Sequence, residues 1–529
     1  MSASSKKKLR KEQEAAKLTE KQLTALNEAK KTKLYTTVFV IAMVVILVVA
    51  ITVGISQIIG NAGIREKNTT ALTIGEQELS NAELNYYFID SVNNFFSQNG
   101  SYASLFGLDS TVPLDEQFFD EETGETWADY FLEYAKSTAT SVYAMNNAAK
   151  AEGFVMPDDV ALNAENMIST YSMYATLSGY PDVDTYIKAM YGKGASAEGL
   201  RNYLEMSMLA EAYSKAHQES LIFSDADLRA AEAENFHKYS SFNYNYYYVA
   251  ASRFQEGETD EDKAAAVAAA EEAANTILSG GITSVEALDA AIAALPINAE
   301  NTTAKSTAYN DYNYTSIDSE LAEWLVEEGR KEGDVGCIAN YASADSDEIL
   351  GYYVVYFHSM NDNNFPTKNV RHILVAFEGG TTDEYGYTTY SDEEKAAAKT
   401  AAEQILNEWK AGEATEDSFG AMATERSDDT GSVEAGGLYE NVYPGQMVEP
   451  FEAWCYDEAR TVGDTGIVET TYGYHVMYFV GNNEQTYRDY QITNALVSAA
   501  QSEWTTGIVD AVTVTEGDTK YLSTNLVLG

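Results

Sequence analysis

The stretch that decides the fold is residues 369–375, which read Asn-Val-Arg-His-Ile-Leu-Val. With the residues after it, this stretch predicts a β-strand over Val370–Phe377, because apolar and β-branched side chains dominate it. The later segment Asp392–Trp409 is rich in Ala and Glu and predicts a helix. The strand also carries His372, one of only five histidines among 529 residues. A strand followed by a helix predicts an α+β unit with a candidate functional histidine.

The same order of elements occurs once earlier in the chain. A predicted strand, Phe242–Ala250, precedes a predicted helix, Asp260–Leu278. Five short matches relate the two regions, always in the same order and at nearly constant offsets along the chain. This pattern predicts a duplicated α+β domain. The matched segments are Tyr248–Ala250 with Leu374–Ala376, Lys263–Ala266 with Lys395–Ala398, Trp324 with Trp454, Gly333–Gly336 with Gly463–Gly466, and Gly351–Phe357 with Gly473–Phe479.

The later copy contains further motifs at fixed spacing. Ser427-Asp428-Asp429 is followed by the turn Gly436-Gly437-Leu438. Residues 445–451 read Gly-Gln-Met-Val-Glu-Pro-Phe, and the series ends with Thr470–His475. Residues 366–481 thereby closely resemble the parvulin family of peptidyl-prolyl cis/trans isomerases, in which an R-H-I-L start, a G-G-L turn, a G-Q-M-V-x-P-F segment and a G-Y-H end recur with this spacing.

The resemblance implies a fold and a site. The fold is a four-stranded antiparallel sheet wrapped by helices. His372 and His475 would lie side by side at the centre of that sheet, and Thr470 would hydrogen-bond within the pair and fix its tautomers. Asp429 falls where many bacterial parvulins have aspartate. The proline-binding pocket is implied to contain Leu438, Met447 and Phe451.

The chemistry of X–Pro rotation suits these residue types. The rotation breaks amide resonance, which imposes a barrier of about 18–20 kcal/mol. Because the twisted amide is less polar than the planar amide, an apolar pocket around the proline ring favours the transition state. His372, His475 and Asp429 would orient and polarise the amide through hydrogen bonds, without a covalent step. No cofactor or metal is expected, and a hydrolase mechanism lacks a suitable nucleophile.

The earlier copy departs from the family at its key positions. Tyr246 stands where His372 stands, Tyr353 stands where His475 stands, and no Gly-Gly turn is present. Residues 236–362 are therefore predicted to form a degenerate parvulin-like domain without isomerase activity, used for binding or spacing. An apolar groove is still expected, because Ile317 and Leu321 match Met447 and Phe451.

Composition excludes several other classes of protein. A chain of 529 residues is too long for one domain. A net charge of −48 argues against broad contact with nucleic acid. The only two cysteines, Cys337 and Cys455, exclude a disulfide framework and a Cys-rich metal site. Cys337 aligns with Ile467, which favours a buried apolar role over a disulfide.

The N-terminal region has its own charge pattern. Ten of the 34 basic residues but only four of the 82 acidic residues lie in residues 1–33. The following segment, 34–64, carries no charge, and Val and Ile dominate Val38–Ile59 within it. Such a segment predicts a transmembrane helix with the Lys-rich side in the cytoplasm. A cleaved signal peptide is the alternative, although its apolar region is normally shorter and its basic start shorter.

The rest of the chain completes the predicted organisation. Ala, Leu, Met, Tyr and Glu dominate residues 61–235 and predict a helical part, in which Tyr and Met side chains are core or an apolar cradle for extended chains. A final predicted helix, Tyr487–Val509, is expected to pack back on these helices. The predicted parts are a cytoplasmic basic tail (1–33), a transmembrane anchor (34–60), a helical chaperone-like domain (61–235), the degenerate repeat (236–362), the parvulin-type domain (366–481) and a C-terminal helix with its tail (482–529).

This layout resembles the extracytoplasmic foldases of the PrsA/SurA type. It predicts a membrane-anchored isomerase whose partners are unfolded or newly exported polypeptides with X–Pro bonds. The alternative is a non-catalytic holdase or surface binding protein that uses the parvulin folds as scaffolds, and a third possibility is a sensor or wall-structural protein. The His372–His475–Asp429 set separates these classes, since a holdase has no need of it. The sequence makes no prediction of the oligomeric state.

Overall fold

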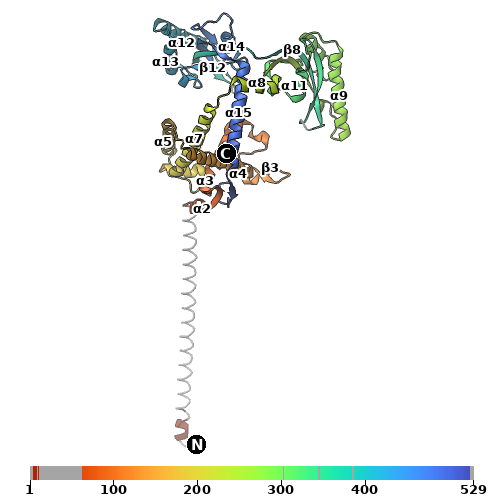
Figure 1. Ribbon diagram of the computed structural model, residues 1–529. Helices are drawn as coiled ribbons and strands as arrows, with labels where there is room; N and C mark the ends of the chain where they lie inside the picture. Colours follow the sequence, from red (N-terminus) through yellow and green to blue (C-terminus); the bar gives the residue numbers. More distant parts are fainter. Residues whose placement is uncertain are drawn as a thin grey trace. The chain divides into compact units, whose positions relative to one another are not determined.

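The computed structural model describes residues 4–8, 10, 62–301, 303–343, 346–383 and 387–524. The predicted anchor at 34–60 and most of the basic tail lie outside these residues. Within the described ranges, no helix combines the length and apolarity that a membrane span requires. The chain divides into two compact units, Met1–Leu221 with Ala500–Gly529, and Ile222–Ala499 (Figure 1).

The first unit is mainly helical, as the sequence predicts. Ser80 and Thr126 cap the two helices that follow them, and each hydroxyl is paired with an acidic residue three positions later in a capping box. Trp127, Phe131 and Phe88 are among the fully buried side chains of its core. Its described helices include α2 (Ile64–Asn68), α3 (Asn81–Asn99), α4 (Trp127–Glu152), α5 (Asp158–Leu177), α6 (Val183–Tyr191) and α7 (Ala197–Ser220).

Segments far apart in the sequence meet in this unit. Strand β1 (Thr70–Ile74) pairs with β2 (Gln77–Ser80) on one side and with β15 (Val514–Glu516) on the other. Trp504 and Ile508 pack against Met145 and Tyr213. The expectation that the C-terminal segment packs back on the N-terminal helices is therefore confirmed. A short hairpin, β3 (Phe118–Asp120) with β4 (Glu125–Thr126), precedes α4.

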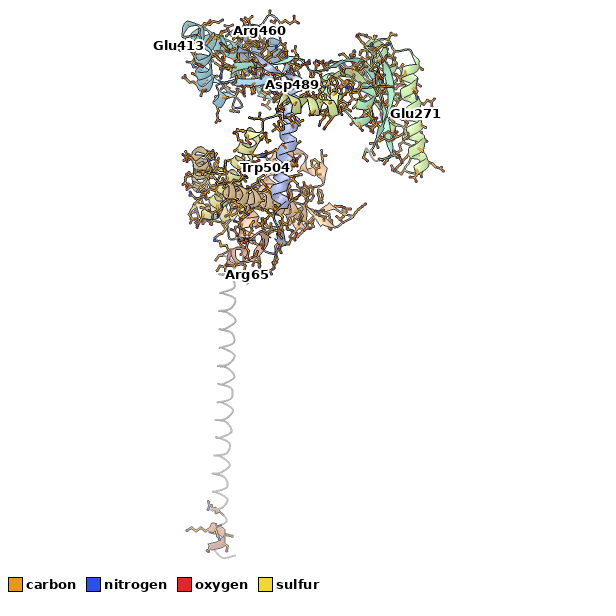
Figure 2. The ribbon with its side chains drawn as sticks, in the orientation of Figure 1. Arg65, Glu271, Glu413, Arg460, Asp489 and Trp504 are labelled. Carbon is orange, nitrogen blue, oxygen red and sulfur yellow. The ribbon has the colours of Figure 1, made fainter. Side chains whose placement is uncertain are left out.

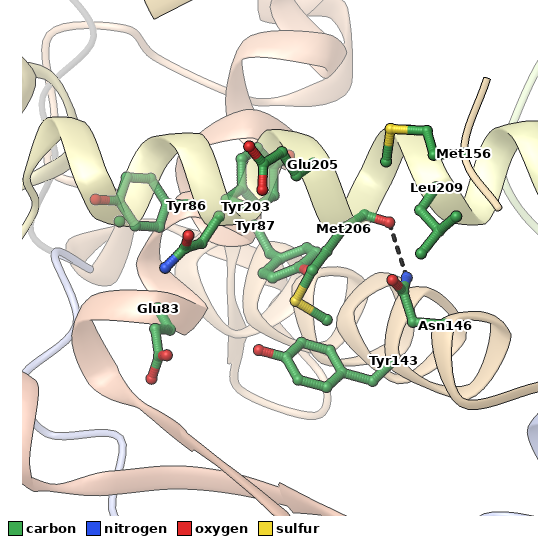
Figure 3. Close-up of a pocket in the computed structure, with 12 residues that line it drawn as sticks. Glu83, Tyr86, Tyr87, Tyr143, Asn146, Met156, Tyr203, Glu205, Met206 and Leu209 are labelled. Carbon is green, nitrogen blue, oxygen red and sulfur yellow. Dashed lines mark hydrogen bonds between the residues drawn. The ribbon is translucent and has the colours of Figure 1, made fainter. Parts of the chain in front are cut away.

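A cavity of about 390 Å³ lies among α3, α4 and α7 (Figure 3). Tyrosine side chains from all three helices line it, including Tyr87, Tyr143 and Tyr203. Tyr87 and Tyr143 are buried, and Tyr203 is half-buried. The packing of the helical unit thus leaves an aromatic pocket rather than a fully filled core.

The second unit contains two antiparallel four-stranded sheets with the same strand order. The strands of the first sheet, in spatial order, are β6 (Thr307–Asn313), β5 (Ser241–Ala250), β8 (Ile349–Asn361) and β7 (Val335–Tyr341). Those of the second are β12 (Leu438–Val442), β9 (Pro366–Ala376), β14 (Gly473–Thr486) and β13 (Thr465–Glu469). A two-stranded ribbon, β10 (Thr381–Thr382) with β11 (Thr388–Thr389), follows β9.

The strand registers agree with the repeat read from the sequence. Tyr248 lies opposite Tyr353 in the first sheet, and Leu374 lies opposite His475 in the second. The helices are also arranged alike. The first repeat has α9 (Asp260–Ser279), α10 (Val285–Ala293) and α11 (Ser319–Leu325), and the second has α12 (Asp392–Ala411), α13 (Glu416–Arg426) and α14 (Glu449–Cys455).

A repeated tryptophan contact explains two of the sequence matches. A Cβ atom placed on Gly336 would lie 2.5 Å from Trp324, and one placed on Gly466 would lie 2.5 Å from Trp454. Only glycine therefore lets each indole lie directly against the neighbouring strand. Arg460 is labelled in Figure 2. Its guanidinium lies over the Trp454 ring at 4.0 Å from the ring centroid, as a cation–π contact.

The two cysteines are free thiols, as the sequence predicts. Cys455 is buried and Cys337 is half-buried. Burial raises the pKa of the Cys337 thiol to about 11, so this thiol is protonated at neutral pH. Neither residue has the lowered pKa of a reactive cysteine.

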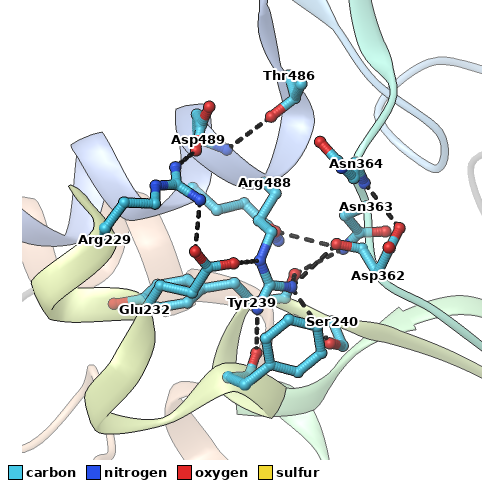
Figure 4. Close-up of polar contacts among 12 residues, drawn as sticks. Arg229, Glu232, Tyr239, Ser240, Asp362, Asn363, Asn364, Thr486, Arg488 and Asp489 are labelled. Atoms are coloured by element: carbon cyan, nitrogen blue, oxygen red, sulfur yellow. Dashed lines mark hydrogen bonds and ion pairs between the residues drawn. The ribbon is translucent and has the colours of Figure 1, made fainter. Parts of the chain in front are cut away.

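Arg488 joins the connecting segments of the second unit (Figure 4). It lies at the start of α15 (Tyr487–Asp510), only 3% exposed, and pairs with Glu232 of α8 (Asp225–Glu234). Its Nη1 donates to the carbonyl oxygen of Asp362 at 2.9 Å. Residues 222–235 were predicted to belong to the helical domain, but they belong to the second unit because α8 packs there.

Candidate active site

The two sequence-predicted histidines meet on the central strands of the second sheet. His372 projects from β9 and His475 from β14, and their rings stack with centroids 5.1 Å apart. Their Nδ1 atoms are 3.0 Å apart, and the residues are only 3% and 6% exposed. One face of this sheet packs against α12 and α13, so the histidines occupy the other face, beside α14.

The hydrogen bonds of the pair run in one direction. Nε2 of His372 lies 2.7 Å from Oδ2 of Asp429, and a carboxylate only accepts, so His372 donates there. Nδ1 of neutral His372 is then an acceptor, and Nδ1–H of His475 donates to it. Nε2 of His475 in turn accepts from the Thr470 hydroxyl at 2.9 Å. The four side chains thus form one chain that fixes both tautomers.

Asp429 is held in place by its own loop. The Ser432 hydroxyl donates to Oδ2 of Asp429, and the Tyr439 hydroxyl donates to the same atom at 3.1 Å. Burial raises the pKa of Asp429, but the hydrogen bonds from Ser432 and His372 outweigh it and lower the pKa to about 2. Asp429 is therefore a carboxylate at every pH at which the protein is expected to work.

Both histidines are neutral at pH 7. Burial lowers the pKa of His475 to about 4, and the neighbouring His372 adds to this effect. Burial also lowers the pKa of His372, although the hydrogen bond to Asp429 opposes the change. A neutral pair is what the directed chain of hydrogen bonds requires.

A cavity of about 280 Å³ opens beside the histidines. Phe451 meets both imidazoles edge to face, with centroids 5.4 Å and 5.3 Å away. Met447 also lines the cavity, as the sequence predicts. The lining residues are His372, Leu374, Asp429, Tyr439, Gln446, Met447, Val448, Phe451, Tyr472 and His475.

Leu438 was predicted in this pocket, and the structure does not place it there. Leu438 pairs with Arg371, whereas the next residue, Tyr439, pairs with Val370. Successive residues of a strand point to opposite faces, so Tyr439 shares the face of Val370 and His372. Tyr439 therefore lines the cavity in place of Leu438.

Hydrogen bonds to backbone carbonyls join the strand segment Arg371-His372 to the turn Gly436-Gly437-Leu438. Nη1 of Arg371 donates to the carbonyl oxygens of Ala435 and Gly436 at 2.8 and 2.9 Å. The His372 amide donates to the Gly437 carbonyl at 2.8 Å. Arg371 is thus a structural clamp that holds the turn against the strand carrying His372.

Replacing Gly437 by alanine should destabilise the second unit by at least about 2 kcal/mol. Gly437 has φ +70°, and a Cβ atom there would lie 2.1 Å from the His372 carbonyl oxygen. Because this oxygen belongs to the backbone of a paired strand, it cannot move away as a flexible side chain could. Denaturant unfolding of the full chain measures the effect. Gly445→Ala is the matched control, because Gly445 also has positive φ (+85°) but no atom within 4 Å of the added Cβ. Equal losses in both variants would contradict the steric argument.

Residues 352–482 match the family model described as the PPIC-type PPIASE domain. The second repeat is a parvulin-type domain. The match begins within β8, earlier than the predicted boundary at 366, and ends within β14. The resemblance predicted from the motifs of residues 366–481 is confirmed.

Known relatives match about a quarter of the chain. Foldase protein PrsA 3 of Bacillus cereus is 35% identical over 124 residues, which are 23% of this chain and 34% of the relative. Foldase protein PrsA 1 of Listeria monocytogenes is 31% identical over 141 residues, 27% of this chain and 40% of the relative. The crystal structure of a peptidylprolyl isomerase (PrsA) from Bacillus anthracis is 20% identical, with 28% of this chain and 59% of that chain covered and a TM-score of 0.18. This chain therefore spans less than half the length of these curated relatives.

Sequence reasoning missed two partners of Asp429 in the parvulin-type domain. Ser432 lies three residues after Asp429, and its amide also bonds to the Asp429 carbonyl in a tight turn. Tyr439 is the residue after the predicted Leu438. The Asp-x-x-Ser spacing is a local turn signal that was available in the sequence. The face of Tyr439 follows from the pairing of β12 with β9, which the sequence does not specify.

Proposed function

We propose that this chain is a peptidyl-prolyl cis/trans isomerase and foldase that acts on exported polypeptides outside the membrane. The observation that carries the proposal is the directed chain from Thr470 through both histidines to Asp429, beside an apolar cavity in a parvulin-type domain. The foldase names of the relatives support the same activity for this chain.

In the proposed mechanism, the cavity binds the proline ring and the histidine chain contacts the amide. Met447 and Phe451 supply apolar contacts to the ring, and these contacts are kept as the amide twists and loses polarity. The neutral imidazoles and the Asp429 carboxylate fix the local field in one orientation, so no group has to reorganise during rotation. No proton transfer and no covalent bond are involved.

Catalysis by the full chain tests this proposal. An unstructured peptide with one X–Pro bond isomerises in tens of seconds without a catalyst. We expect the chain to shorten that time at micromolar concentration, as followed by protease-coupled absorbance or by exchange NMR. An unchanged rate in the presence of the folded chain would refute the isomerase assignment.

The stability of the chain should fall as the pH drops from about 6.5 to 4. His475 has a folded-state pKa of about 4, below its ordinary value of 6.5, so the unfolded state binds the extra proton in this range. The loss reaches about 3 kcal/mol when it is complete. Asp429 stays ionised throughout this window because its pKa is about 2. Urea midpoints at pH 7 and 4.5 measure the effect, and a His475→Asn variant should lose less. An equal pH dependence in both proteins would contradict the assignment.

The proposal includes a non-catalytic role for the first repeat. Tyr353 replaces the second histidine, and its hydroxyl donates to Asp318 and accepts from Asn340 at 2.8 Å. Burial raises the pKa of Tyr246 to about 12, so this side chain stays neutral. The Tyr246 and Tyr353 rings meet edge to face, with centroids 5.6 Å apart. Two such phenols lack the directed imidazole chain of the second repeat, which supports binding or spacing by residues 236–362.

Residues 34–60 are proposed to anchor the chain in the cell membrane with the N-terminus in the cytoplasm. The uncharged run over 34–64 and the Lys-rich segment before it support this orientation. Residues 61–221 would then form the chaperone part, residues 366–481 the catalytic domain, and residues 482–529 the C-terminal helix and tail. Unfolded or newly exported polypeptides with X–Pro bonds are the proposed clients.

A further inference from the structure

The cavity among α3, α4 and α7 has no role in the proposed isomerase reaction (Figure 3). It lies in the first unit, and its volume of about 390 Å³ exceeds that of the cavity beside the histidines. Aromatic and flexible apolar side chains dominate its walls. The twelve lining residues are Glu83, Tyr86, Tyr87, Tyr143, Asn146, Met156, Gly199, Asn202, Tyr203, Glu205, Met206 and Leu209.

The aromatic walls of this cavity are held in fixed positions. The Tyr86 hydroxyl donates to the Ser196 carbonyl at 3.1 Å and accepts from the Ser196 amide at 3.0 Å. The Tyr86 ring stacks on Tyr203, whose hydroxyl donates to Asp90 at 2.6 Å. Asn146 of α4 donates to a backbone carbonyl of α7 at 2.8 Å. The rings are therefore organised before any ligand arrives, which reduces the entropy lost on binding.

Among the described residues, the charges that line this cavity are negative. Glu83 and Glu205 are its charged residues, and none of the twelve lining residues is basic. No basic side chain among the described residues has a nitrogen within 4.0 Å of either carboxylate. Burial above all, and the Glu83 charge to a smaller extent, raise the pKa of Tyr86, so this phenol is neutral at pH 7. A cationic ligand complements both the carboxylates and the electron-rich ring faces.

We propose that this cavity binds the arginine or lysine side chain of an extended polypeptide. The cationic group lies against the tyrosine rings and near Glu205, and apolar neighbours in the polypeptide contact Met156, Met206 and Leu209. Methionine side chains adapt to varied partners, which suits a site for many sequences. This role goes beyond the isomerase activity, because it selects client segments by a basic residue and needs no proline.

Binding of two proline-free peptides to the full chain tests the proposal. One peptide alternates leucine with arginine, and the other replaces each arginine by citrulline, which has nearly the same shape but no charge. Fluorescence anisotropy should show the arginine peptide binding about five- to tenfold more tightly, the range of one cation–π contact with a carboxylate nearby. Glu205→Gln should remove most of that preference. Glu211→Gln should not, although it removes the same charge from α7, because Glu211 is exposed like Glu205 but does not line the cavity.

Several outcomes would overturn the proposal. Equal affinity for the arginine and citrulline peptides would do so, and so would equal losses in Glu205→Gln and Glu211→Gln, which would indicate only attraction to an acidic protein. A photoreactive arginine peptide gives a readout independent of these variants. It should label Met156, Met206 or Leu209 in the unmodified chain, and labelling confined to other positions would also overturn the proposal. Because neither peptide contains proline, these results are separate from success or failure of the isomerase assay.

Discussion

Replacing His475 by alanine should lower kcat/KM for X–Pro isomerisation about 10- to 100-fold. The Nδ1–H of His475 donates to the acceptor Nδ1 of His372, and its Nε2 accepts from Thr470. Without it, Nδ1 of His372 loses its partner in a buried site, an effect of about 1–3 kcal/mol. A change of about 1.4 kcal/mol in the barrier is a factor of ten in rate, which gives the expected range.

The first repeat provides the matched control for this variant. Tyr353 occupies the register position of His475, because it lies opposite Tyr248 as His475 lies opposite Leu374. Tyr353→Ala should leave kcat/KM unchanged. Melting curves of both variants, measured with the rates, separate lost chemistry from lost folding. A rate that falls equally in the two variants, or in neither, would remove the histidine pair from the proposed mechanism.

The sequence predicted much of the second unit because its repeat carries the strand register. Alternating apolar residues fix which face of a strand is buried, and one slip in register would reverse every side chain. The five ordered matches therefore aligned Tyr246 with His372 and Tyr353 with His475. In the structure, these residues occupy equivalent positions in the strand pairing of the two sheets. Four of the predicted site residues, His372, Asp429, Thr470 and His475, lie in one hydrogen-bonded chain.

The remaining features depend on contacts that a linear pattern does not contain. Leu438 was misplaced by one residue, and the bulge in β12 between Tyr439 and Val442 removes the simple alternation that would have corrected it. Strands β1 and β15 are only five and three residues long, and their pairing joins segments that are far apart in the sequence. Short strands with distant partners give little periodicity to detect.

Arg488 is the clearest case of a residue whose role comes from distant partners. Nothing near it in sequence marks it as more than a basic residue at the start of a helix. In the structure its guanidinium lies over the Phe236 ring, 3.8 Å from the ring centroid. It also pairs with Glu232 (Figure 4). Its Nη1 also lies within hydrogen-bonding distance of the Tyr239 carbonyl, 3.3 Å away. One planar guanidinium thus satisfies groups from α8, from the start of the first repeat and from the link between repeats.

Arg488→Met should therefore destabilise the second unit by about 3–5 kcal/mol, the usual effect of removing one partner from a buried ion pair. Methionine keeps much of the volume, but it leaves Oε1 of Glu232 and several backbone carbonyls without the donor that Arg488 supplies. Oε2 of Glu232 keeps its contact with Arg229. Urea unfolding of the full chain, followed by tryptophan fluorescence and by isomerase activity, measures the loss. Arg488→Lys should recover only part of the stability, because an ammonium group lacks the planar fork that reaches these acceptors together.

Arg229 supplies the comparison that tests this reasoning. It pairs with the same Glu232 and with Asp489, but its side chain is 50% exposed. Exposed pairs contribute little, so Arg229→Met should change stability by less than about 1 kcal/mol. If the two arginine variants lost similar stability, the loss of a positive charge beside Glu232 would by itself explain both effects. A loss confined to Arg488→Met would instead show that burial and the number of satisfied carbonyls make this residue the organiser of the second unit.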